Sequence, residues 1–182
     1  MNFVEIISDL DQTPELHIAR LLILINEFTE DKDEGSIEGL TKLAKLDFLL
    51  RYPVMLEKAL KAKNKSTKNV MVENHEYQSV ESEMVRYRFG PWDYHYRNYL
   101  NILVAKGLVF ISIEGRKIVI SLTEAGIRCA NSLAQEADFE PYVRRSKLIK
   151  CHFNLTATNL MRFIYNTFPE IISLNSGKRI TI

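Results

Sequence analysis

Residues 90–133 read GPWDYHYRNYLNILVAKGLVFISIEGRKIVISLTEAGIRCANSL, and this stretch decides the fold that we predict. Gly90-Pro91 interrupts the preceding chain, and the carboxylate of Asp93 can cap the free backbone N–H groups of a helix from about Tyr94 to Lys106. Gly107 follows as a left-handed helix stop. The apolar residues of this helix have the i, i+3, i+4, i+7 spacing of one buried face: Tyr96, Tyr99, Leu100 and Leu103.

After Leu108 the apolar period changes to two, which indicates a β-hairpin with its turn at Glu114-Gly115. Thr123 can then cap a further helix that runs to about Ala134. The apolar face of the hairpin comprises Val109, Ile111, Ile113, Ile118, Ile120 and Leu122. A helix, a two-stranded hairpin and a packing helix are typical of the second half of a winged helix-turn-helix. Because winged helices both read DNA and dock proteins, the pattern determines the function only in part.

We therefore predict a mainly α protein with a small antiparallel hairpin (α+β). It consists of a winged helix-turn-helix core with N- and C-terminal helical extensions. Residues 1–35 form the N-terminal helical segment, residues 36–135 the core and residues 136–182 the C-terminal helical extension. Within the core, the polar stretch 63–77 is predicted to be a mobile insertion.

Capping residues and prolines predict where the other helices begin and end. Thr13-Pro14 starts a helix to about Phe28, whose apolar residues lie on more than one face, so we expect it to be covered from several sides. Ser36 opens a second helix, which Pro53 ends or kinks before a third. Residues 79–85 are predicted to form one or two helical turns. Two C-terminal helices, from about 139 and 157, precede a loose tail at 175–179.

Composition favours a soluble cytoplasmic protein. The 182 residues are 46% hydrophobic and 26% charged, and the net charge of +1 excludes a strong global attraction to nucleic acid. The start of the chain lacks the basic region of a secretory signal, and no apolar run is long enough to span a membrane. The two cysteines match no ligand spacing. The four histidines are scattered and no phosphate-binding glycine motif occurs, so we expect no enzyme, no cofactor and no metal.

Two sets of residues are candidates for contacts with other molecules. Cations around the hairpin can bind phosphates without reading the sequence of double-stranded DNA: Arg116, Lys117, Arg97, Lys106, Arg86 and Arg88. A solvated turn with ordinary surface charge is an equally good interpretation of the hairpin tip. Large amphipathic side chains and paired arginines can anchor a partner protein: Trp92, Tyr94, Arg144 and Arg145.

Four motifs, in their order and spacing, carry a resemblance to a known family. They are 43–53 (LAKLDFLLRYP), 86–93 (RYRFGPWD), 107–109 (GLV) and 122–126 (LTEAG). This combination resembles the middle component of ABC-three-component systems, and in particular the small subunit of Lamassu-type anti-phage and anti-plasmid defence systems. The resemblance implies a non-catalytic accessory subunit with two partners, an SMC-like coiled-coil ATPase and a nuclease effector, and possible contact with DNA.

Two other classes of function stay open. A stand-alone winged-helix transcription regulator or antitoxin would be a dimer that binds one operator tightly, whereas an accessory subunit would bind DNA weakly and without sequence preference. An enzyme would require His95 or His152 to meet a carboxylate in a pocket. We expect no membrane partner.

Overall fold

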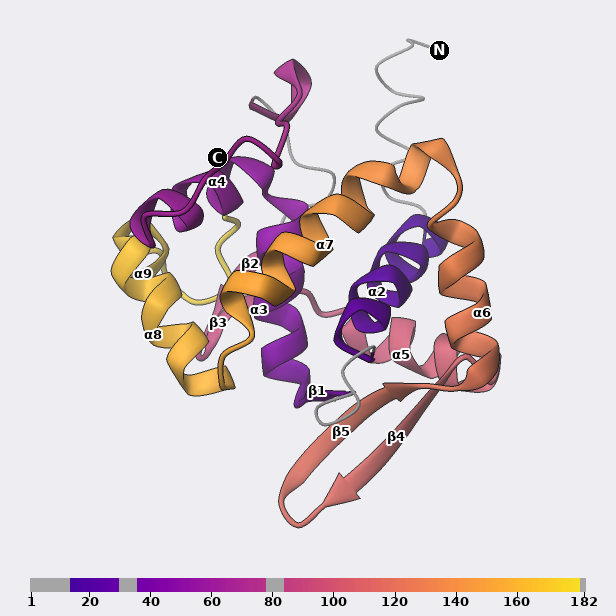
Figure 1. Ribbon diagram of the computed structural model, residues 1–182. Helices are drawn as coiled ribbons and strands as arrows, with labels where there is room; N and C mark the ends of the chain where they lie inside the picture. Colours follow the sequence, from indigo (N-terminus) through magenta and orange to yellow (C-terminus); the bar gives the residue numbers. More distant parts are fainter. Residues whose placement is uncertain (1–13, 30–35, 78–83, 181–182) are drawn as a thin grey trace, which may run out of the picture.

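The computed structural model describes residues 14–29, 36–77 and 84–180 (Figure 1). Its α-helices are α2 (Pro14–Thr29), α3 (Leu40–Arg51), α4 (Pro53–Ala62), α5 (Tyr96–Ala105), α6 (Glu124–Leu133), α7 (Glu140–Phe153), α8 (Ala157–Thr167) and α9 (Pro169–Ser173). Its strands are β1 (Ile37–Glu38), β2 (Val85–Tyr87), β3 (Gly90–Trp92), β4 (Val109–Glu114) and β5 (Lys117–Leu122). Two 3₁₀ turns, Asn74–Tyr77 and Ala137–Phe139, complete the described elements. The predicted mainly helical fold with a small antiparallel sheet is confirmed.

Helix α2 lies at the centre of the helical layer, where α5, α6, α7 and strand β5 contact it. Residues on all of its sides are buried, including Leu21, Leu24 and Ile25, which are 0% exposed. This confirms that the helix is covered from several sides, as its apolar residues predict. The predicted cap Thr13 lies outside the described residues. One hydrophobic core runs from Leu21 to Ile180, so it joins all three predicted segments, whose boundaries stay predictions.

The predicted hairpin is confirmed, but its turn is Gly115-Arg116, one residue later than predicted, because Glu114 still pairs with Lys117. Strands β4 and β5 pair antiparallel from Val109 with Leu122 to Glu114 with Lys117, and Gly115 adopts a φ of +62° in the turn. The hydroxyl of Thr123 accepts a hydrogen bond from the Gly126 N–H at 3.0 Å, so it caps α6 as predicted.

A short strand stands where the sequence indicated a helix start. Ile37 and Glu38 pair with Ile120 and Val119 of β5, which gives a three-stranded sheet in the order β1-β5-β4. Helix α3 begins only at Leu40, and Pro53 separates it from α4 as predicted.

The C-terminal tail is held to the strand β2, which corrects two predictions. Residues 79–85 were expected to be helical, but Val85 opens β2, which pairs with β3; residues 78–83 lie outside the described residues. The tail was expected to be loose, but Ile180 is 1% exposed and its carbonyl accepts a hydrogen bond from Tyr52 Oη at 3.0 Å. Backbone hydrogen bonds between Arg86 and the residues Gly177 and Lys178 explain the difference, because they extend the β2–β3 ribbon.

The 63–77 segment also differs from the loose insertion that the sequence predicts. Val70 is 0% exposed in the core. The guanidinium of Arg145, on α7, donates to the carbonyls of Val70 and Met71 at 3.0 Å each and to both carboxylate oxygens of Glu76 at 2.7 Å. A charge-assisted clip therefore holds this segment against α7.

The start of α5 is corrected as well. The helix begins at Tyr96, two residues after the predicted start, and His95 occupies the cap position. Asp93 accepts a hydrogen bond from the His95 N–H at 2.8 Å, while its second carboxylate oxygen lies 2.8 Å from Arg51 Nη2. An ion pair with a buried arginine of α3 thus determines the place of Asp93.

Candidate interaction surfaces

The apolar face of the β4–β5 hairpin continues beyond the core into solvent. Near the base, Val109 and Ile120 are buried, whereas towards the tip Ile111 is 42% exposed, Ile118 46% and Ile113 77%. These side chains share one face, because β-strand side chains alternate and Ile111 and Ile113 pair with Ile120 and Ile118. Figure 1 shows the hairpin extending away from the helices. We call Ile111, Ile113 and Ile118 the hairpin surface; exposed apolar side chains that gather in this way are typical of interaction sites.

Strand β4 also offers backbone groups. It is the edge strand of the β1-β5-β4 sheet in the part of the chain that the structure describes. The carbonyl of Leu108 accepts a hydrogen bond from Thr123 N–H at 3.0 Å, so in the antiparallel pattern Val109, Ile111 and Ile113 direct their backbone groups away from β5. The hairpin surface therefore borders a sheet edge that none of the described strands occupies, and another chain can pair with it.

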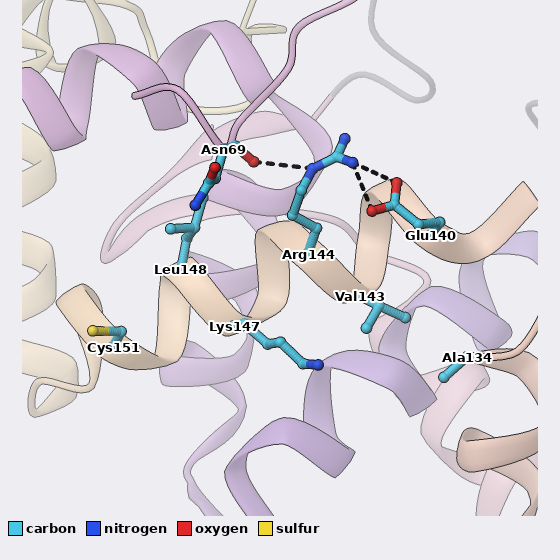
Figure 2. Close-up of a pocket in the computed structure, with 8 residues that line it drawn as sticks. All are labelled: Asn69, Ala134, Glu140, Val143, Arg144, Lys147, Leu148 and Cys151. Carbon is cyan, nitrogen blue, oxygen red and sulfur yellow. Dashed lines mark hydrogen bonds and ion pairs between the residues drawn. The ribbon is translucent and has the colours of Figure 1, made fainter. Parts of the chain in front are cut away.

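A second surface lies along α7, where a groove of about 580 Å³ opens beside the helix (Figure 2). Six lining residues follow the 3, 4, 7, 8 and 11 spacing of one helix face: Glu140, Val143, Arg144, Lys147, Leu148 and Cys151. Asn69 and Ala134 line it from the 63–77 segment and from the end of α6. We call this the α7 groove.

The two arginines on α7 have different surroundings. Arg144 lies in the groove, where it donates to Glu140 Oε1 at 2.6 Å and to the Asn69 carbonyl at 3.0 Å. Arg145 is 2% exposed and forms the clip described above. Because its guanidinium is committed inside the chain, an intrachain role replaces the partner contact that the sequence suggested for Arg145.

The buried ionic network joins α2, α3 and α5. Asp47 accepts hydrogen bonds from Arg20 Nε and Arg51 Nε, each at 2.8 Å, and from Tyr96 Oη at 2.6 Å. Burial alone would raise the pKa of Asp47, but the two guanidiniums and the hydrogen bonds outweigh it and hold the pKa well below its usual range. Since Asp47, Arg20 and Tyr96 are 0% exposed, we assign the network to stability.

Two further titratable groups are buried. Burial, assisted by the charge of Arg20, lowers the pKa of His17 on α2 to about 3. Burial lowers the pKa of Lys45 on α3 to about 8, and its ammonium donates to the Thr41 carbonyl at 2.9 Å. Across residues 14–29, 36–77 and 84–180, no three His, Cys, Asp or Glu side chains are placed to hold a metal ion. None of the helices in these ranges is long and apolar enough to cross a membrane.

The model of one protein family, ABC-three component (ABC-3C) system Middle Component 4, matches residues 32–151, about two-thirds of the chain. The chain belongs to this family. Searches among curated proteins and among solved structures found no significant match. As a middle component of a multi-component system, the ABC-3C subunit works with partner proteins. The matched region contains both the hairpin surface and the α7 groove.

The DNA-contact candidates of the middle component lie on separate elements. At the hairpin tip, Arg116 is exposed, whereas Lys117 forms an ion pair with Glu38 at 2.7 Å. That hydrogen bond lowers the pKa of Glu38. The exposed Arg97 and Lys106 stand at opposite ends of α5. Their contact with DNA stays a prediction.

The other two cations belong to the β2–β3 ribbon of the ABC-3C subunit. The backbone of Arg86 pairs with the C-terminal tail, and the guanidinium of Arg88 lies 5.3 Å from the centre of the Phe89 ring. The structure thus separates Arg86 and Arg88 from the hairpin tip, and the candidates do not lie on one element.

The aromatic partner candidates differ in exposure. Trp92 is half-buried, and its ring lies 5.7 Å from that of Tyr87 and 5.5 Å from that of Tyr96, so internal packing accounts for most of its surface. Tyr94 is 63% exposed and remains a candidate anchor. Sequence reasoning missed the hairpin surface as a site, although the isoleucine pattern was visible, because the pattern alone does not show where the core ends.

Proposed function

We propose that this chain is a non-catalytic accessory subunit of a prokaryotic anti-phage or anti-plasmid defence system. In this proposal it works in the cytoplasm, where it bridges an SMC-like coiled-coil ATPase and a nuclease effector. The family match supports a subunit that has partners. The motif resemblance to the Lamassu small subunit supports the identity of those partners and the defence role.

We also propose that the core is a winged helix. The order α2, β1, α3, then α5 and the β4–β5 hairpin supports this, because a winged helix likewise places a short strand beside its wing. The first core helix would then be α2, and not α3 as the sequence suggested. The helix α4, residues 63–77 and the β2–β3 ribbon would form an insertion between the second and third core helices.

The observation that carries the accessory function is the hairpin surface. Ile113 is 77% exposed on a strand edge that can pair with another chain. Burying an isoleucine side chain is worth about 1.5–3 kcal/mol, so the three isoleucines could supply much of a stable interface. DNA contact at Arg116 would be a weaker, sequence-independent addition.

Co-expression with the ATPase and nuclease encoded beside its gene tests this function. Ile113→Asp should abolish their co-purification without lowering the melting temperature, because the side chain lies outside the core. Ile172→Asp on α9 is the matched control, since Ile172 is 46% exposed and lies outside the family match. Co-purification of the Ile113 variant at wild-type yield would refute the docking role. A dimer that binds one operator tightly would favour the alternative, a transcription regulator or antitoxin.

A further inference from the structure

The α7 groove runs along α7 and is long enough for a second helix to bind in it. From Glu140 to Cys151 the lining face of α7 spans eleven residue steps, or about 16 Å at 1.5 Å per residue. That length corresponds to three turns of a second helix laid alongside. The apolar part of the groove consists of Val143, Leu148 and Ala134, all half-buried.

The charges in the α7 groove are only partly compensated. Glu140 and Arg144 neutralise one another, and Figure 2 shows Arg144 directed toward Asn69 and away from Lys147. Lys147 is exposed and, among residues 14–29, 36–77 and 84–180, has no ion-pair or hydrogen-bond partner. Among the residues that the structure describes, the groove therefore presents Lys147 as a cation without a partner beside apolar side chains, which is complementary to a carboxylate on an amphipathic surface.

One wall of the groove is fixed in place. Asn69 precedes Val70 and Met71, whose carbonyls the buried guanidinium of Arg145 holds at 3.0 Å. Met71 adopts a left-handed φ of +49°, which is strained for a side chain of its size, and it is 58% exposed. Met71 does not itself line the groove, but its fixed backbone holds the neighbouring Asn69 wall in place.

We propose that the α7 groove seats an amphipathic helix from another component of the ABC-3C system. Its apolar side chains rest on Val143 and Leu148, and a carboxylate pairs with Lys147. The inference rests on the proposed accessory function and names the kind of partner segment. A second copy of this chain is a poorer occupant. Two antiparallel α7 helices, paired about the middle of the lining face, would bring Lys147 opposite Arg144, and these two cations would repel each other.

Two substitutions in the full chain, co-expressed with the other components, test the groove. Lys147→Glu should weaken capture of the partner roughly tenfold or more, because the charge pair becomes a repulsion. Val143→Glu should act in the same direction, and it should spare the fold because Val143 is not among the described side chains that pack against the core. Lys58→Glu, at an exposed lysine of α4, is the matched charge control and should bind like wild type.

The exposed Cys151 provides an independent readout within the groove. Iodoacetamide should label it in the isolated chain but not in the assembled complex, and a cross-linker attached there should capture an acidic, helical peptide of a partner component. Normal assembly with Cys151 still labelled would overturn the groove proposal and leave the accessory function standing. Capture of a second copy would also overturn the groove proposal, whereas absence of assembly in the wild type would overturn the accessory function itself.

Discussion

Replacing Asp47 with Asn should destabilise the protein strongly. The substitution preserves the shape of the side chain but leaves Arg20 and Arg51, which are 0% and 2% exposed, without the charge that both of them contact. Removing one partner of a buried ion pair costs about 3–5 kcal/mol. For a chain of this size each kcal/mol lowers the melting temperature by about 2–4 °C, so we expect a decrease of about 6–20 °C.

Thermal unfolding followed by circular dichroism measures this decrease. Glu38→Gln is the matched control, because it removes the carboxylate of an exposed ion pair, with Lys117, that is worth about 1 kcal/mol or less. The pKa of Asp47 is lowered in the folded state, so its contribution is present above the unfolded pKa of about 3.9 and is lost as the pH falls further. The difference in melting temperature between the wild type and the Asp47→Asn variant should therefore become smaller below about pH 4. Melting temperatures of the two variants within about 2 °C of each other at pH 7 would contradict this explanation.

Three further predictions concern single side chains. The pKa of His17 is lowered to about 3, so only the unfolded chain takes up its proton between about pH 6.5 and 3, and stability falls as the pH falls through this window. Urea titrations should show that the free energy of unfolding falls by about 1.6 kcal/mol from pH 6.5 to 5 and that His17→Gln removes this fall; an unchanged slope in the variant would contradict this. Tyr52→Phe should lower the free energy of unfolding by about 1–3 kcal/mol and expose the tail to proteolysis, because Tyr52 Oη accepts from Met84 N–H at 2.7 Å and donates to the Ile180 carbonyl. A stability equal to that of Tyr94→Phe would count against this prediction. Arg116→Glu should weaken DNA binding by the assembled complex at low salt and reduce the salt slope by about one, since one phosphate contact is lost; an unchanged slope in a filter-binding titration would show that the hairpin tip is structural only.

The candidate site was predictable only where a residue acts through its near neighbours. Tyr94 was a candidate anchor because its side chain is large and amphipathic, and it is 63% exposed. Arg145 was a candidate because arginine makes directed contacts with partner groups. Its role depends on carbonyls 74 and 75 residues away, so the sequence could not distinguish its role from that of Arg144. The α7 groove has a readable helical spacing, yet its exposure depends on what α6 and the 63–77 segment leave uncovered.

Local sequence patterns were enough to predict four features: the helix after Gly90-Pro91, the β4–β5 hairpin, the Thr123 cap and the break at Pro53. Each depends on hydrogen bonds and side-chain periodicity within a few residues, which a linear pattern records directly. The remaining features depend on contacts between distant parts of the chain. The pairing of β1 with β5, the tether of the tail through Tyr52 and the capture of Asp93 by Arg51 join residues that lie 42 to 128 positions apart. Such contacts form because burial leaves polar groups no partner except one another, and that condition exists only once the core has closed.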